Sequence, residues 1–193
     1  MKNIGLYFGT YNPFHIGHLI IANHLAEHTD LDEVWLVITP QSPFKKKKNM
    51  LEDHHRFEMV YRATEYYDKL KPSDVEFKLP QPNFTSKTLA ELNDKHTDKN
   101  FALIMGEDNL VNFHKWKNHE HILKHHKLYI CPRMTDAKIP KRFQDCKTIV
   151  MTDTPVMEIS STLIRQMIKS GKNAQPLLQH KVWEYIDEMN FYR

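Results

Sequence analysis

Two short segments of the chain carry side chains suited to holding phosphate groups. The first, GTYNPFHIGH at residues 9–18, opens on Gly9 and Thr10 and places His15 and His18 one helical turn apart. Free N–H groups and the positive end of a helix dipole make such a helix start attractive to phosphate. Zinc is a weaker alternative, because no cysteine or carboxylate lies nearby to complete a ligand set. Two ordinary surface histidines would be the preferred interpretation if this segment stood alone.

The second segment, EISSTLIR at residues 158–165, has the same character. Ser160, Ser161 and Thr162 stand at the start of a predicted helix, and Arg165 lies one turn inside it. Hydroxyls, backbone amides and a guanidinium can together hold a polyphosphate through charge-assisted hydrogen bonds. The commoner meaning of such a pattern is a helix N-cap followed by a solvent-exposed arginine. A second phosphate-suited helix start in one chain weakens that alternative.

Strands and helices alternate along the sequence and must bring these segments together. Continuous apolar runs predict strands, and apolar residues at helical spacing predict helices. The predicted strands are 2–8, 33–39, 73–77, 101–106, 127–131 and 148–152, and the predicted helices are 16–28, 51–67, 84–96, 160–171 and 181–189. Such alternation favours an α/β fold with a mostly parallel sheet and helices on both faces. Without a repeat or compositional break, residues 1–193 are expected to form a single domain.

Ligands of such folds bind beyond the C-terminal ends of the strands. Every unusual loop of this chain lies at such an end: residues 9–18, 39–48 and 106–109, and the segment that begins at Ser160. This shared location predicts one binding site built from four separate parts of the sequence.

Composition excludes several classes of protein. With 193 residues, 40% hydrophobic and 26% charged, the chain is typical of a folded globular protein. It lacks a run of ~18 apolar residues and a signal peptide, so we expect no membrane association and a cytoplasmic location. The net charge of +3 is too small to indicate nucleic-acid binding, and most of the lysine run 45–48 is expected to be solvated. Cys131 and Cys146 are expected to be reduced thiols.

HIGH at 15–18, paired with ISSTLIR at 159–165, resembles the signature of the Rossmann-like nucleotidyltransferases, which transfer AMP or CMP from a nucleoside triphosphate. Four further stretches resemble the nicotinate-nucleotide adenylyltransferase family: TPQSPFKK, HHRFEMV, NFTSKTLAEL and LIMGEDNLVNFHKW. The resemblance covers essentially the whole chain. Departures lie in the first loop, where Phe8, Tyr11 and Asn12 replace the family's glycine, phenylalanine and aspartate, and at NFT, where SYT is common.

The resemblance implies that ATP, with Mg²⁺, and nicotinate mononucleotide form nicotinate adenine dinucleotide and pyrophosphate. It assigns His18 to the α-phosphate, His15 and Lys45 to the triphosphate, and Ser161 and Arg165 to the β- and γ-phosphates. His15, His18, Lys45 and Arg165 are the expected catalytic residues. The remaining ATP contacts are expected from Gly9, Thr10, Gly106, Asp108, Ser160 and Thr162, and those to nicotinate mononucleotide from Phe84, Thr85, Trp116 and Lys45.

Several alternatives remain open at the level of sequence. The acceptor could be nicotinamide mononucleotide or phosphopantetheine, although GEDN and the downstream Trp116 argue against the latter. A non-catalytic nucleotide-binding protein, or a nucleic-acid binder that uses the lysine run, is the other class. The pairs His24/His28 and His121/His125 lack a third ligand, so no protein-bound metal is expected. Arg56 is expected on a helix surface, and the oligomeric state is left undetermined.

Overall fold

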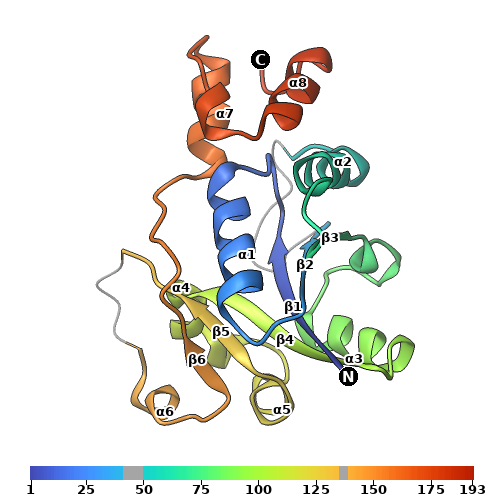
Figure 1. The fold of residues 1–193 in the computed structure, drawn as a ribbon, viewed down its shortest axis with the longest axis vertical. Helices are drawn as coiled ribbons and strands as arrows, with labels where there is room; N and C mark the ends of the chain where they lie inside the picture. Colours follow the sequence, from blue (N-terminus) through green and yellow to red (C-terminus); the bar gives the residue numbers. More distant parts are fainter. Residues whose placement is uncertain (41–49, 135–138) are drawn as a thin grey trace.

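The computed structural model describes residues 1–40, 50–134 and 139–193, and Figure 1 shows their fold. Six parallel strands form one sheet in the order β3-β2-β1-β4-β5-β6. Their bounds are β1 Lys2–Gly9, β2 Glu33–Ile38, β3 Leu70–Ser73, β4 Lys99–Gly106, β5 Leu128–Cys131 and β6 Ile149–Met151. In the central register Leu6 of β1 pairs with Trp35 of β2 and with Leu103 of β4. The predicted parallel α/β fold is confirmed.

Two hydrophobic clusters lie on opposite faces of the sheet, because neighbouring strand residues point to opposite sides. Leu6 belongs to one cluster and Tyr7 to the other. The cluster with Tyr7 includes residues of helices α1 (Ile16–His28), α2 (Asp53–Thr64), α7 (Ser161–Lys169) and α8 (His180–Glu188). The cluster with Leu6 includes residues of α3 (Thr85–Lys95), α4 (Glu107–Val111), α5 (His119–His125) and α6 (Lys141–Gln144). Helices therefore cover both faces, as the sequence predicts.

The predicted strand at 73–77 is wrong. Strand β3 is Leu70–Ser73, and Val75–Lys78 form a 3-10 helix, η1. Pro72 lies inside β3 and interrupts the sequence pattern, but a proline is tolerated because β3 is an edge strand. Among the described residues there are also two shorter 3-10 helices, η2 at Phe113–Lys115 and η3 at Gln175–Leu177.

Arg56 of α2 is buried, not exposed as the sequence suggests. Its side chain has no exposed surface and donates to the backbone carbonyls of Thr10, Thr39 and Leu51. It also forms an ion pair with Asp53. The start of α2 is therefore fastened to the loops that follow β1 and β2.

Both predicted helix starts are confirmed. Helix α1 begins after His15, and α7 begins after Ser160, whose hydroxyl accepts a hydrogen bond from the Leu163 N–H. In Figure 1, α7 and α8 lie together near the C-terminus. No helix in the described part of the chain has the length and apolar character of a membrane span.

Candidate active site

A cavity of about 1140 Å³ opens where the strand ends meet the helices. Its walls come from the loops after β1, β4 and β5, the segment before α3 and the start of α7. Every described residue of the predicted site lines it: Gly9, Thr10, His15, His18, Phe84, Thr85, Gly106, Asp108, Trp116, Ser160, Ser161, Thr162 and Arg165. Lys45 lies outside the described residues. Segments up to about 150 positions apart thus share one cavity, as the strand-end argument predicts.

His15 and His18 form a stacked pair on the cavity wall. Their ring centroids lie 3.6 Å apart, and the planes differ by 22°. The backbone N–H of His15 donates to Nδ1 of His18 at 3.2 Å. An accepting Nδ1 carries no proton, so this bond fixes the tautomer with the hydrogen on Nε2 of His18. In this tautomer His18 can donate a hydrogen bond from Nε2.

The His15 ring is neutral in the ligand-free protein at pH 7. Burial, with a smaller effect from the positive charge of Arg133, lowers the pKa of His15 to about 4. Nδ1 of His15 is buried without a hydrogen-bond partner among the described residues. Gly17 keeps this arrangement compact, because a Cβ there would lie 3.2 Å from Nδ1 of His15. A bound phosphate would favour the protonated ring.

The unusual loop residues hold the loop in shape. Tyr11 adopts the left-handed backbone conformation, with φ of 47°, and its buried hydroxyl donates to the Tyr7 carbonyl. Its ring covers Gly9, where a Cβ would lie 2.5 Å from the tyrosine ring, so position 9 has room only for glycine. The Asn12 amide oxygen accepts from the Leu51 N–H at 3.2 Å and from the Tyr192 hydroxyl at 2.8 Å. Tyr11 and Asn12 therefore connect the loop to the core and to two distant segments.

The start of α7 is bonded directly to the same loop. The Ser161 hydroxyl donates to the Pro13 carbonyl at 2.9 Å. The guanidinium of Arg165 donates to the Asn12 carbonyl at 2.7 Å and to the Thr162 hydroxyl at 3.3 Å. These bonds set the positions of the two helix starts relative to each other. Arg165 has five N–H donors, so two such bonds leave others for a ligand.

Arg133, which the sequence reasoning missed, is a further cation on the cavity wall. It follows β5, and its Nε lies 4.0 Å from the Asp108 carboxylate. Its backbone N–H donates to Glu107, and its Nη1 donates to the Met157 carbonyl at 3.4 Å. In the sequence, Arg133 stands two residues beyond the end of a predicted strand, but no motif or spacing marks it out there.

Aromatic residues line the cavity beside the start of α3. Phe84 and Trp116 are half-buried, and the Lys117 ammonium lies 5.1 Å from the centre of the Phe84 ring. Nearby, Glu76 and Asn83 are buried and also line the cavity. This part of the cavity combines flat apolar faces with polar groups, which suits a polar heteroaromatic ring.

Cationic and hydrogen-bond donor groups dominate the part of the cavity around α1 and α7. The described residues hold one trio of potential metal-binding side chains, Glu52, His54 and His55, and none of these lines the cavity. A divalent ion in this cavity would therefore depend on ligand oxygens and water for much of its coordination. Mg²⁺ is commonly bound this way, through substrate phosphates and retained waters.

Comparison with known proteins identifies relatives over the whole length. The model of the cytidylyltransferase-like family matches residues 6–167. A protein of Christiangramia forsetii, described as a probable nicotinate-nucleotide adenylyltransferase, is 57% identical over 192 residues, which cover 100% of this chain and 99% of that protein. One of Flavobacterium psychrophilum with the same description is 58% identical over 190 residues, 98% of each chain.

The fold also matches a solved structure. Nicotinic acid mononucleotide adenylyltransferase of Plasmodium falciparum, complexed with NaAD, superimposes with a TM-score of 0.80. The alignment covers 100% of this chain and 98% of the other, at 18% sequence identity. At that identity the likeness establishes the fold alone.

Proposed function

The chain belongs to the nicotinate-nucleotide adenylyltransferase family, and we propose that it joins ATP to nicotinate mononucleotide, forming nicotinate adenine dinucleotide and pyrophosphate. The whole chain then acts as one catalytic domain in NAD synthesis. The observation that carries this proposal is the pairing of two helix starts, α1 and α7, on one cavity that also holds an aromatic region. The region around the two helix starts suits a triphosphate, and the aromatic region suits a pyridine ring.

In this reaction the phosphate of the mononucleotide attacks the α-phosphorus of ATP, and pyrophosphate leaves. The second pKa of a phosphate monoester is near ~6, so the nucleophile is already ionised at neutral pH. A general base is therefore unnecessary. The protein must align two anionic substrates and neutralise charge that develops on the phosphoryl oxygens.

We assign the charge-neutralising role to the residues around the two helix starts. His18 donates from Nε2 to the α-phosphate, and His15 becomes protonated when the triphosphate binds beside it. Arg165 and the backbone amides at Ser161 hold the β- and γ-phosphates, together with Lys45. We add Arg133, because its position on the same wall supports a phosphate contact. Gly9, Thr10, Ser160 and Thr162 supply the remaining phosphate-side contacts, and Gly106 and Asp108 contact the adenosine ribose.

The mononucleotide binds in the aromatic region. The indole of Trp116 stacks on the pyridine ring, and the N–H groups at the start of α3, beside Phe84 and Thr85, read its carboxylate. A carboxylate at a helix start is favoured over a neutral amide, so nicotinate mononucleotide is the preferred acceptor.

Mg²⁺ bound to ATP would supply additional neutralisation of the triphosphate charge. The cavity fits this role. Because its walls are cationic, phosphate oxygens and water would coordinate the ion. We place the reaction in the cytoplasm, which the free thiols of Cys131 and Cys146 support.

A pyrophosphate-release assay tests the proposal. The protein is incubated with ATP, Mg²⁺ and one of three acceptors: nicotinate mononucleotide, nicotinamide mononucleotide or phosphopantetheine. We expect release with nicotinate mononucleotide at the highest kcat/KM. A preference for either other acceptor would reassign the substrate. Binding of ATP without release for any acceptor would identify a non-catalytic nucleotide-binding protein.

A further inference from the structure

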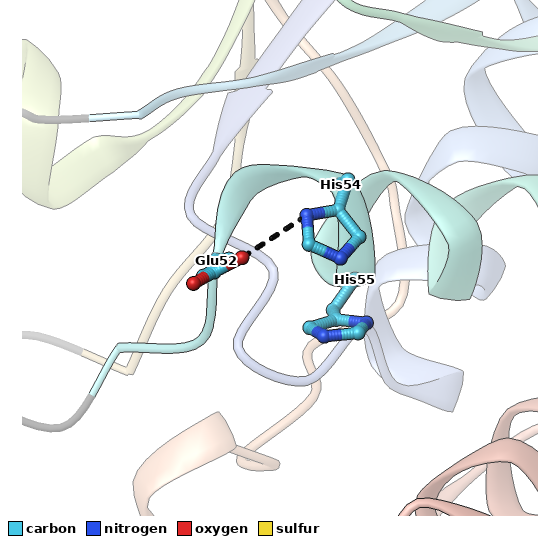
Figure 2. Close-up of side chains that lie close together, drawn as sticks. All are labelled: Glu52, His54 and His55. Atoms are coloured by element: carbon cyan, nitrogen blue, oxygen red, sulfur yellow. Dashed lines mark ion pairs between the residues drawn. The ribbon is translucent and has the colours of Figure 1, made fainter.

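Three potential metal ligands meet at the start of α2, outside the active-site cavity. They are Glu52, His54 and His55, drawn in Figure 2, and each offers one ligand atom within 4.8 Å of the others. Nδ1 of His54 lies 3.4 Å from the Glu52 carboxylate, and the two imidazole ring centroids lie 3.9 Å apart. Donor atoms around a tetrahedral Zn²⁺, with bonds near ~2.1 Å, are separated by about 3.4 Å. Small side-chain rotations would therefore bring all three onto one ion.

Two side chains from the C-terminal part of the chain contact the His55 ring. Its Nδ1 lies 2.8 Å from the hydroxyl of Tyr185 in α8, and the Phe191 ring contacts it edge-on at a centroid distance of 4.8 Å. Metal-binding histidines usually donate their second ring N–H to such an outer partner, which fixes the ring for coordination through the other nitrogen. Tyr185 can accept this bond, which leaves Nε2 of His55 to face an ion.

The ligand types select the class of metal. Two imidazoles and one carboxylate suit Zn²⁺ and related transition-metal ions, whereas Mg²⁺ and Ca²⁺ prefer oxygen ligands alone. The side chains of Glu52 and His54 are 80% and 65% exposed, so an ion can reach them from solvent. The positive end of the α2 dipole opposes a cation at this position, and the charge of Glu52 offsets that effect.

We propose that Glu52, His54 and His55 bind one Zn²⁺ ion, with water in the remaining coordination position. This proposal replaces the expectation from the sequence that no metal is bound by protein ligands. The ion would fix the start of α2, which carries Arg56. The Arg56 guanidinium donates to the Thr10 carbonyl, in the loop between β1 and α1. Zinc binding is thus expected to stabilise α2 and the loop together, because a ligand that binds only the folded state raises its stability.

Zinc titration of the full chain, in competition with a chromogenic chelator and without nucleotide or Mg²⁺, tests the proposal. We expect one equivalent to bind to the wild type. His54→Gln should weaken that binding by more than ~10-fold, and Tyr185→Phe by about 10-fold, because loss of an outer partner typically costs that much. His54 is exposed, so the variant is expected to keep the wild-type melting temperature in EDTA.

Two controls separate this site from zinc binding elsewhere. The double variant His121→Gln, His125→Gln removes another close pair of histidines, with ring centroids 4.5 Å apart, and should bind zinc as the wild type does. His18→Gln tests the pair on the cavity wall and should also retain binding. Absence of zinc binding by the wild type, or undiminished binding by His54→Gln, would overturn the proposal.

Discussion

The buried guanidinium of Arg56 donates a hydrogen bond of 2.6 Å to the backbone carbonyl of Thr10. A helix residue with no exposed surface thereby supports the loop that holds His15 and His18. The same side chain also donates to the carbonyls of Leu51 and Thr39. Removal of the guanidinium would leave all three carbonyls without this donor.

Arg56→Met is therefore expected to destabilise the protein by at least ~2 kcal/mol, because it leaves three partly buried carbonyl groups without this donor. Urea unfolding, followed by circular dichroism, measures this change. Arg62→Met is the matched control on the same helix. Arg62 is partly exposed, pairs with Glu58 and lies over the Tyr185 ring, so its loss is expected to cost less than the loss of Arg56. Equal effects of the two variants would contradict the supporting role of Arg56.

His18→Ala is expected to lower kcat by at least ~100-fold, because it removes the hydrogen-bond donor that we assign to the α-phosphate. The melting temperature should remain close to that of the wild type, since His18 is only half-buried. His24→Ala, on the same helix, removes a pair with the exposed carboxylate of Asp153 and should leave kcat unchanged. Near-normal turnover by a folded His18→Ala protein would show that His18 has no role in the chemistry.

Trp116→Ala is expected to raise KM for nicotinate mononucleotide by roughly 3- to 10-fold, through the loss of ring stacking. KM for ATP should stay constant, because we place ATP in the other part of the cavity. Trp116→Phe retains an aromatic face and serves as the control. Steady-state kinetics with each substrate varied in turn separates the two constants, and a rise confined to KM for ATP would refute the assignment.

The lowered pKa of His15 predicts how stability depends on pH. The unfolded chain gains a proton on this ring near pH 6.5, whereas the folded protein does so only near pH 4. Between these values protons favour the unfolded state, so stability falls as pH falls from 6.5 to about 4. The full contribution is roughly 3 kcal/mol, at 1.36 kcal/mol per pKa unit.

Urea unfolding of the ligand-free protein at several pH values measures this slope. His15→Gln should show a shallower loss of stability between pH 6.5 and 4, whereas His121→Gln, an exposed residue, should match the wild type. An unchanged slope in His15→Gln would mean that the ring titrates normally in the folded state.

The sequence predicts most of the fold because long apolar segments carry strong periodic patterns. Helix α1 matches the predicted range 16–28, and most strand ends agree within two residues. The pattern fails at β3, where Pro72 interrupts an edge strand whose position is set by pairing with β2. It fails again at Arg56, because a charged residue is ordinarily exposed and its partners are carbonyls distant in sequence.

The site is predicted less completely than the fold. The two histidines and the serine-rich helix start have recognisable spacing, but Arg133 stands in an ordinary context, CPRM, with no spacing of its own. Tyr11 and Asn12 depart from the family pattern, and the role of Asn12 emerges only from long-range hydrogen bonds to Leu51 and Tyr192. Contacts of this kind depend on tertiary structure, which local patterns do not encode.

The Asn12 side chain also constrains the order in which the protein can mature on the ribosome. Its amide oxygen is synthesised well before one of its partners, the hydroxyl of Tyr192, which follows 180 residues later. Arg165, which donates to the Asn12 carbonyl, is likewise made late. The loop around His15 gains its full set of hydrogen bonds only after residue 192 has left the exit tunnel. The loop between β1 and α1 therefore reaches its final set of contacts only when segments that lie more than 150 positions apart have folded together.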